Sequence, residues 1–124
     1  MEAQKIWNYF YGKIGNEYGV AGLMGNLKAE SALKSINLQN GYEKKLGYTD
    51  TTYTDAVDNG TYEHFVTDAA GYGLAQWTYH SRKAALLKFA QSRNASIGNL
   101  EMKMDYLWKE LSQTYTGTLS VLKS

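Results

Sequence analysis

The stretch that decides the fold is NEYGVAGLMGNLKAES, residues 16–31. Its apolar residues recur at i, i+3, i+4 and i+7, the spacing of one face of an α-helix: Val20, Leu23, Met24 and Leu27. Asn16 is of a type that caps helix N-termini, so we expect a helix that starts after Asn16 and runs to about Glu30. At about 100° per residue, Glu30 falls at the edge of the apolar stripe.

The rest of the chain is also mainly helical in pattern. We expect further helices over residues 2–14, 51–59, 78–94 and 118–124, another after residue 96, and one turn at residues 43–46 of the loop 31–50. Residues 62–67 are aromatic and β-branched, and residues 68–71 form a turn into residues 72–77, which predicts one small β-hairpin. The expected fold class is therefore α+β, mainly α-helical.

Composition narrows the functional classes. The 124 residues contain no Cys, which excludes disulfides and a thiol nucleophile. The chain has thirteen Lys and Arg and twelve Asp and Glu, so its net charge is +1. It lacks the excess of positive charge that is typical of nucleic-acid binding. No apolar run suffices for membrane insertion, and the first residues lack the pattern of a signal peptide. We expect one domain over residues 1–124, truncated at its C-terminal edge because the last helix has no terminating signal.

Glu30 is the first candidate for chemistry. Partial burial and the negative end of the helix dipole would both raise the pKa of its carboxyl group. Cleavage of a glycosidic bond needs such an acid, which holds its proton until it passes it to the leaving oxygen. A Glu at a helix end also occurs in purely structural networks, so Glu30 alone does not establish an enzyme.

The second candidate is the stretch GYGLAQWT, residues 71–78. Its two glycines permit a close approach of the backbone, and Tyr72, Gln76 and Trp77 offer ring faces and an amide to a sugar. The alternative is a tight hairpin around a buried Trp.

The order and spacing of these two stretches resemble a known superfamily. Residues 25–31 resemble the helix-ending Glu-Ser motif of lytic transglycosylases and goose-type lysozymes, and residues 73–76 are similar to their Gly-Leu-Met-Gln strand. Nearly the whole chain resembles the phage tail lysozyme family. The resemblance implies a lysozyme-like fold with a cleft between the hairpin and the helical body, and a module of a phage tail or wall-hydrolase assembly at the virion tail or cell wall.

The resemblance also carries residue roles. Glu30 matches the catalytic acid, Ser31 the motif residue beside it, and Gln76 the strand Gln that borders the cleft. Asp68, five residues before Gly73, lies near the position of the goose-type Asp and is our candidate for orienting the attacking water. The match departs from that pattern at Ala75, which replaces Met, and at Trp77 and Thr78, where a second Asp can stand.

Glu43 is the alternative to Asp68 as the second carboxylate. It lies in the long loop after the helix of Glu30, beside two lysines that favour a solvated surface position. The distance between the carboxyl groups of Glu30 and the second carboxylate would decide between a retaining and an inverting route. The sequence gives no such distance.

We therefore expect a muramidase that cleaves the bond between N-acetylmuramic acid and N-acetylglucosamine of bacterial peptidoglycan. Ser31, Tyr72, Gln76 and Trp77 are the expected substrate-binding residues. The alternatives are a lytic transglycosylase, which forms a 1,6-anhydro end and needs no second carboxylate, and a tail module that binds glycan without cleaving it. No cofactor is expected, since His64 and His80 are too few for a metal site and no Gly-x-Ser-x-Gly elbow occurs.

Overall fold

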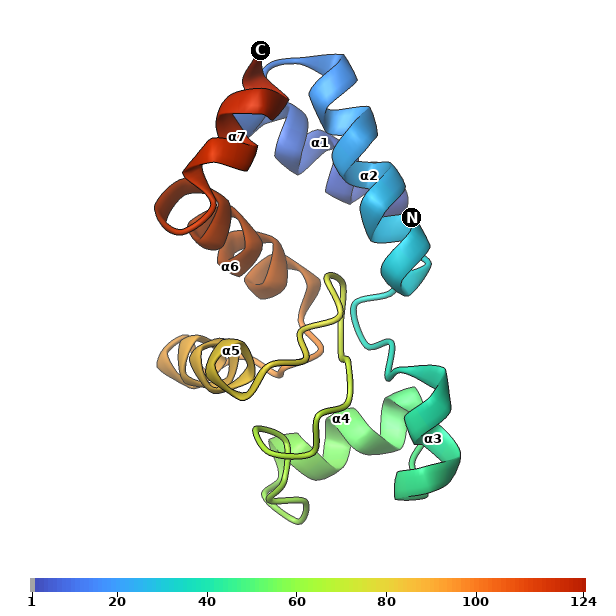
Figure 1. Ribbon diagram of the computed structural model, residues 1–124. Helices are drawn as coiled ribbons and strands as arrows, with labels where there is room; N and C mark the ends of the chain where they lie inside the picture. Colours follow the sequence, from blue (N-terminus) through green and yellow to red (C-terminus); the bar gives the residue numbers. More distant parts are fainter. Residues whose placement is uncertain (1) are drawn as a thin grey trace.

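The computed structural model describes residues 2–124, and Met1 lies outside the described part. The described chain forms seven helices around one core (Figure 1). Their bounds are α1 Glu2–Ile14, α2 Glu17–Ser31, α3 Asn40–Leu46, α4 Asp50–Asp58, α5 His80–Ser92, α6 Leu100–Gln113 and α7 Thr116–Lys123. None of the described helices is long and apolar enough to cross a membrane.

Local sequence signals account for where several helices begin. The side chain of Asn16 accepts hydrogen bonds from the backbone amides of Tyr18 and Gly19, which caps α2 as expected. Thr49 and Thr52 form a reciprocal capping box at the start of α4, and Asn99 accepts a hydrogen bond from the Met102 amide at the start of α6. The predicted helices are therefore confirmed, with ends shifted by a few residues.

The predicted β-hairpin is wrong. Residues 62–67 form no strand, and pairing near residues 72–77 is limited to two isolated antiparallel bridges, Leu38 with Tyr72 and Tyr72 with Trp77. Tyr62 and Phe65 instead pack their rings against Tyr53 of α4. The aromatic content of this segment serves a side-chain cluster, so its β-propensity does not produce a sheet.

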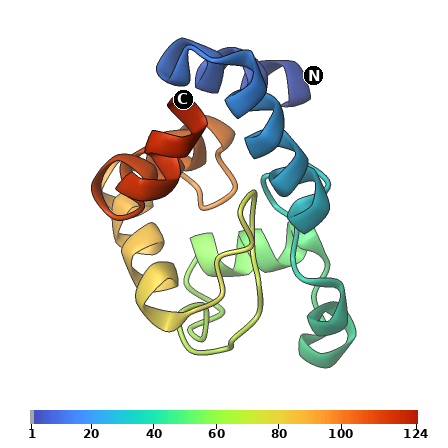
Figure 2. The same ribbon diagram turned by 45° about the horizontal axis from the view of Figure 1, so that its top comes forward.

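Residues 59–79 form an irregular loop at the centre of the molecule, which we call the central loop. In both views it runs between the end of α2 on one side and α5 on the other (Figures 1 and 2). Leu74 and Trp77 of this loop have no exposed surface. The loop is therefore part of the core that positions the end of α2.

Helix α7 packs against α2 through a glycine. A Cβ atom on Gly19 would overlap the carbonyl oxygen of Leu122 in α7. A Cβ atom on Gly22, one turn further along α2, would have no neighbouring heavy atom within 4 Å. Contact between α2 and α7 thus depends on the missing side chain at residue 19.

These two glycines form a matched pair for a stability test. Gly22→Ala should raise the free energy of unfolding by about 0.5–1 kcal/mol, because Ala favours a helix interior over Gly. Gly19→Ala should lower it by about 1–3 kcal/mol, because the added methyl group forces α7 away from α2. Urea denaturation followed by circular dichroism measures both. Equal stabilisation by the two substitutions would contradict the packing of α7 on α2.

Candidate active site

Ser31 connects the end of α2 to the central loop. Its side chain is buried, with 1% of the residue exposed. Its hydroxyl oxygen lies 2.6 Å from the carbonyl oxygen of Leu74 and 2.9 Å from that of Leu27. The contact joins residues 43 positions apart, so the two sequence motifs lie side by side. Ser31 was expected to bind substrate, but its hydroxyl is directed into the protein.

Glu30 is exposed, and the burial predicted for it in the free protein is wrong. The buried stripe of α2 consists of Val20, Leu23, Leu27 and Ser31. Since Ser31 follows Leu27 by four residues, it continues the stripe, and Glu30 is turned about 100° away from it. No described residue forms a hydrogen bond or ion pair with the Glu30 carboxyl group, which is open to a ligand.

Tyr72 and Trp77 lie in the core rather than on a sugar-binding surface. Both have 0% of their surface exposed. The Lys103 ammonium lies 4.0 Å from the centroid of the Tyr72 ring, and the indole nitrogen of Trp77 donates a hydrogen bond to Glu110 at 2.9 Å. Stacking of a sugar on either ring is therefore blocked, which corrects the expectation for both residues.

Gln76 stabilises the turn that the central loop makes at residues 73–76. Its backbone lies in the left-handed region with a φ of 48°, which is uncommon for a residue other than Gly. The side-chain amide nitrogen donates hydrogen bonds to the carbonyl oxygens of Asn37 at 2.7 Å and Gly73 at 3.0 Å. These bonds stabilise the unusual backbone and fix the direction of the side chain.

Three polar side chains surround Gly71. A Cβ atom on Gly71 would lie 2.8 Å from Gln76 Oε1, 3.2 Å from Thr78 Oγ1 and 3.3 Å from Gln39 Oε1. Gln39 is exposed, while Gln76 and Thr78 are half-buried. We call Gln39, Gln76 and Thr78 the polar rim. The sequence pointed only to Gln76, because Gln39 stands in a loop without any motif.

Asp68 is fully engaged inside the protein. Its side chain is 3% exposed and forms an ion pair with Lys83 of α5 at 2.6 Å. The same oxygen accepts a hydrogen bond from the Ala70 amide at 3.0 Å, and the second oxygen accepts bonds from Tyr53 at 2.6 Å and Tyr62 at 2.7 Å. Burial alone would raise the pKa of Asp68, but these donors outweigh it and lower the pKa below its usual value. No lone pair is left to orient a water molecule.

Glu43 of α3 is partly exposed and lies beside Asp50. A hydrogen bond with Asp50, with a smaller contribution from burial, raises the pKa of Glu43. Asp50 in turn accepts a hydrogen bond from the Leu38 amide at 2.9 Å. Unlike Asp68, Glu43 remains accessible to solvent.

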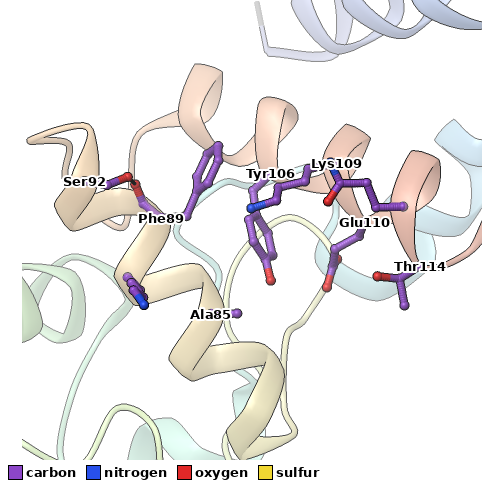
Figure 3. A pocket seen from close by; sticks show the side chains of 9 residues that line it. Ala85, Phe89, Ser92, Tyr106, Lys109, Glu110 and Thr114 are labelled. Atoms are coloured by element: carbon purple, nitrogen blue, oxygen red, sulfur yellow. Dashed lines mark hydrogen bonds between the residues drawn. The ribbon is translucent and has the colours of Figure 1, made fainter.

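A pocket of about 390 Å³ opens between α5 and α6 (Figure 3). None of the residues predicted for the active site lines this pocket. Within residues 2–124, no three His, Asp or Glu side chains converge closely enough to hold a metal ion.

A mainly helical domain that joins a helix-ending Glu-Ser pair to a Gly-Leu-Ala-Gln loop is of the lysozyme-like class. The sequence profile described as phage tail lysozyme matches residues 1–124, the whole chain. The chain belongs to the phage tail lysozyme family, which confirms the resemblance seen in the sequence. Membership indicates lysis of peptidoglycan by an enzyme associated with the virion tail or the wall. No curated protein and no solved structure matches the chain.

The structural role of Asp68 has a measurable consequence. Asp68→Asn should lower the free energy of unfolding by about 3–5 kcal/mol at neutral pH, because it leaves the buried Lys83 ammonium without its counter-ion. The matched control is Asp55→Asn, which neutralises an exposed carboxylate of α4 and should change stability little.

The ion pair between Asp68 and Lys83 also predicts that the stability of the protein depends on pH. The pKa of Asp68 is lower in the folded protein than its ordinary value of 3.8. Its stabilising contribution is therefore fully present above pH 3.8 and is lost as the pH falls through the lowered folded value. Denaturation curves at several pH values should show the difference between wild type and Asp68→Asn shrinking in acid. A difference that stays constant would contradict the ion pair.

Proposed function

We propose that this domain cleaves the glycan strands of peptidoglycan and that Glu30 is the catalytic acid. The observation that carries this proposal is the hydrogen bond from Ser31 to Leu74, which places the residue next to Glu30 against the Gly-Leu-Ala-Gln loop. Family membership supports the substrate class. In this proposal Glu30 donates its proton to the glycosidic oxygen between N-acetylmuramic acid and N-acetylglucosamine.

Exposure of Glu30 in the free protein is compatible with this role. A glycan strand that binds across the end of α2 would cover the Glu30 carboxyl group and exclude water from it. Desolvation disfavours a charged carboxylate and favours a proton-holding acid. We therefore assign the desolvation to the bound substrate rather than to the fold.

We propose that the polar rim contacts the sugars in place of Tyr72 and Trp77. Gln76 Oε1 accepts no hydrogen bond from any described residue, and the amide nitrogen of Gln39 donates none. Thr78 Oγ1 donates to the Gln76 carbonyl oxygen at 2.9 Å and can still accept a bond. Such groups are suited to the hydroxyl and acetamido groups of amino sugars.

The state of Asp68 bears on the type of reaction. Hydrolysis needs a group that orients or activates the attacking water molecule. In lytic transglycosylation, a hydroxyl group of the sugar itself attacks the anomeric carbon instead. Because all hydrogen-bonding positions of Asp68 are occupied, we propose a structural role for it. This observation favours the transglycosylase as the second candidate function, and a muramidase would use Glu43 instead.

Substitution of Glu30 tests the proposed acid. Glu30→Gln should lower the rate of lysis of purified peptidoglycan by about 10²–10⁴-fold, because the amide cannot donate the catalytic proton. Its thermal unfolding should match that of wild type, since the side chain is exposed. Glu63→Gln, at another exposed carboxylate, is the control and should keep full activity. Wild-type activity in Glu30→Gln would refute the assignment of Glu30 as the acid, whereas binding of peptidoglycan without lysis by the wild type would identify a glycan-binding module.

Product analysis separates the two reactions. Mass spectrometry of the released fragments should show 1,6-anhydro ends, one water lighter than reducing ends, if Asp68 has only its structural role and no other group activates water. Glu43→Gln should then leave the products and the rate unchanged. Reducing ends that disappear in Glu43→Gln would instead identify a muramidase with Glu43 as the second carboxylate.

A further inference from the structure

The pocket between α5 and α6 is built from both helices. Ala85, Lys88, Phe89 and Ser92 come from α5, and Tyr106, Lys109, Glu110 and Gln113 come from α6, with Thr114 following. Figure 3 shows the side chains of Tyr106 and Glu110 directed from α6 toward α5. Its volume of about 390 Å³ lies within the range of ligand sites for small molecules.

One wall of the pocket is aromatic. The rings of Phe89 and Tyr106 are tilted against each other with centroids 5.2 Å apart. Ser92, Gln113 and Thr114 add hydroxyl and amide groups at the edge. Flat apolar faces next to polar groups match the faces and the hydroxyl groups of a sugar ring.

The charge of the pocket is positive. Glu110 is 7% exposed, and its carboxylate is neutralised by two hydrogen bonds from Arg82, at 2.8 and 3.0 Å, and one from Trp77. Lys88 and Lys109 form no ion pair with any described residue; the Lys109 ammonium lies 5.4 Å from the centroid of the Phe89 ring. Two lysines thus flank an aromatic wall with no acidic group left to satisfy them.

The distribution of charge along the chain reinforces this local balance. Residues 80–124 contain seven Lys and Arg against three Asp and Glu, a net charge of +4. Residues 1–79 contain six against nine, a net charge of −3. The pocket therefore lies wholly in the basic part of a nearly neutral domain. Helices α5 and α6, whose residues line it, lie on the other side of the central loop from the end of α2 (Figures 1 and 2).

We propose that this pocket binds an anionic saccharide, a sugar unit that carries a carboxylate or phosphate, at a site separate from the one that contains Glu30. The sugar packs against the part of Phe89 that the Arg93 guanidinium, 4.3 Å from the ring centroid, leaves uncovered, and the anion is bound by Lys88 and Lys109. The inference rests on the proposed function in taking the saccharide from the cell wall. Such a site holds the domain on the polymer while another segment of the wall reaches Glu30.

The test is an NMR titration of ¹⁵N-labelled Glu30→Gln protein, which cannot cleave the probe under the proposed function. One arm uses the disaccharide of N-acetylglucosamine and N-acetylmuramic acid without peptide, whose anion is the lactyl carboxylate, and the other uses N-acetylglucosamine 6-phosphate. We expect one of the two to shift amide signals of residues 85–92 and 106–114, with affinity falling as salt is added. Lys88→Ala with Lys109→Ala should weaken that binding by about tenfold.

Lys44→Ala with Lys45→Ala is the matched control, because it removes the same charge from the exposed side of α3 and should leave the affinity unchanged. Equal weakening by both double variants would show unspecific charge attraction and overturn the proposal. Shifts confined to the residues around Glu30, or no shifts with either probe, would also overturn it. Lysis by the wild type is measured separately, so failure of the pocket and failure of Glu30 as the acid are distinguishable.

Discussion

The Lys83 ammonium has no exposed surface, and its burial is the constraint on which the irregular centre of the molecule depends. A buried charge is tolerated only with a counter-ion and further hydrogen bonds. Asp68, the Ala70 carbonyl oxygen and the Tyr53 hydroxyl provide these contacts at 2.6, 2.8 and 3.2 Å. The central loop has no ladder of backbone hydrogen bonds, so such side-chain anchors hold it in place.

Arg82, the neighbour of Lys83, fastens the other end of the same loop. Adjacent residues of a helix point about 100° apart, so α5 directs one cation to Asp68 and the other to Glu110. Through Glu110, Arg82 also holds the indole of Trp77. In the sequence, Leu74 lies between Asp68 and Trp77, the two anchored residues of the loop. Its carbonyl oxygen accepts a hydrogen bond from Ser31. One turn of α5 thus determines where the loop meets the end of α2.

Much of the helical framework could be predicted from the sequence, because apolar spacing and capping residues such as Asn16 and Thr49 act locally. The hairpin could not, since aromatic and β-branched residues are equally suited to a ring cluster around Tyr53. The exposure of Glu30 could not be predicted, because the buried stripe continues to Ser31, a small polar residue that does not belong to the apolar pattern. Tyr53 and Lys83, which bond to Asp68, lie 15 positions away from it, and Glu110 lies 33 positions away from Trp77, beyond the reach of local patterns.

Hydrogen-bonding capacity separates the residues that are bonded within the fold from those still able to bind a ligand more sharply than motif membership does. Ser31, Asp68 and Trp77 belong to the recognised motifs, yet their polar groups are bonded within the protein. Glu30 and Gln76 belong to the same motifs and retain an open carboxyl group and an open amide oxygen. A buried polar group must be satisfied when the chain folds, so only groups left open after folding can change partners when a substrate arrives. By this criterion the motifs supply both the residues that hold the fold together and the groups that the proposed function assigns to the substrate, and Gln39 joins the second set without belonging to any motif.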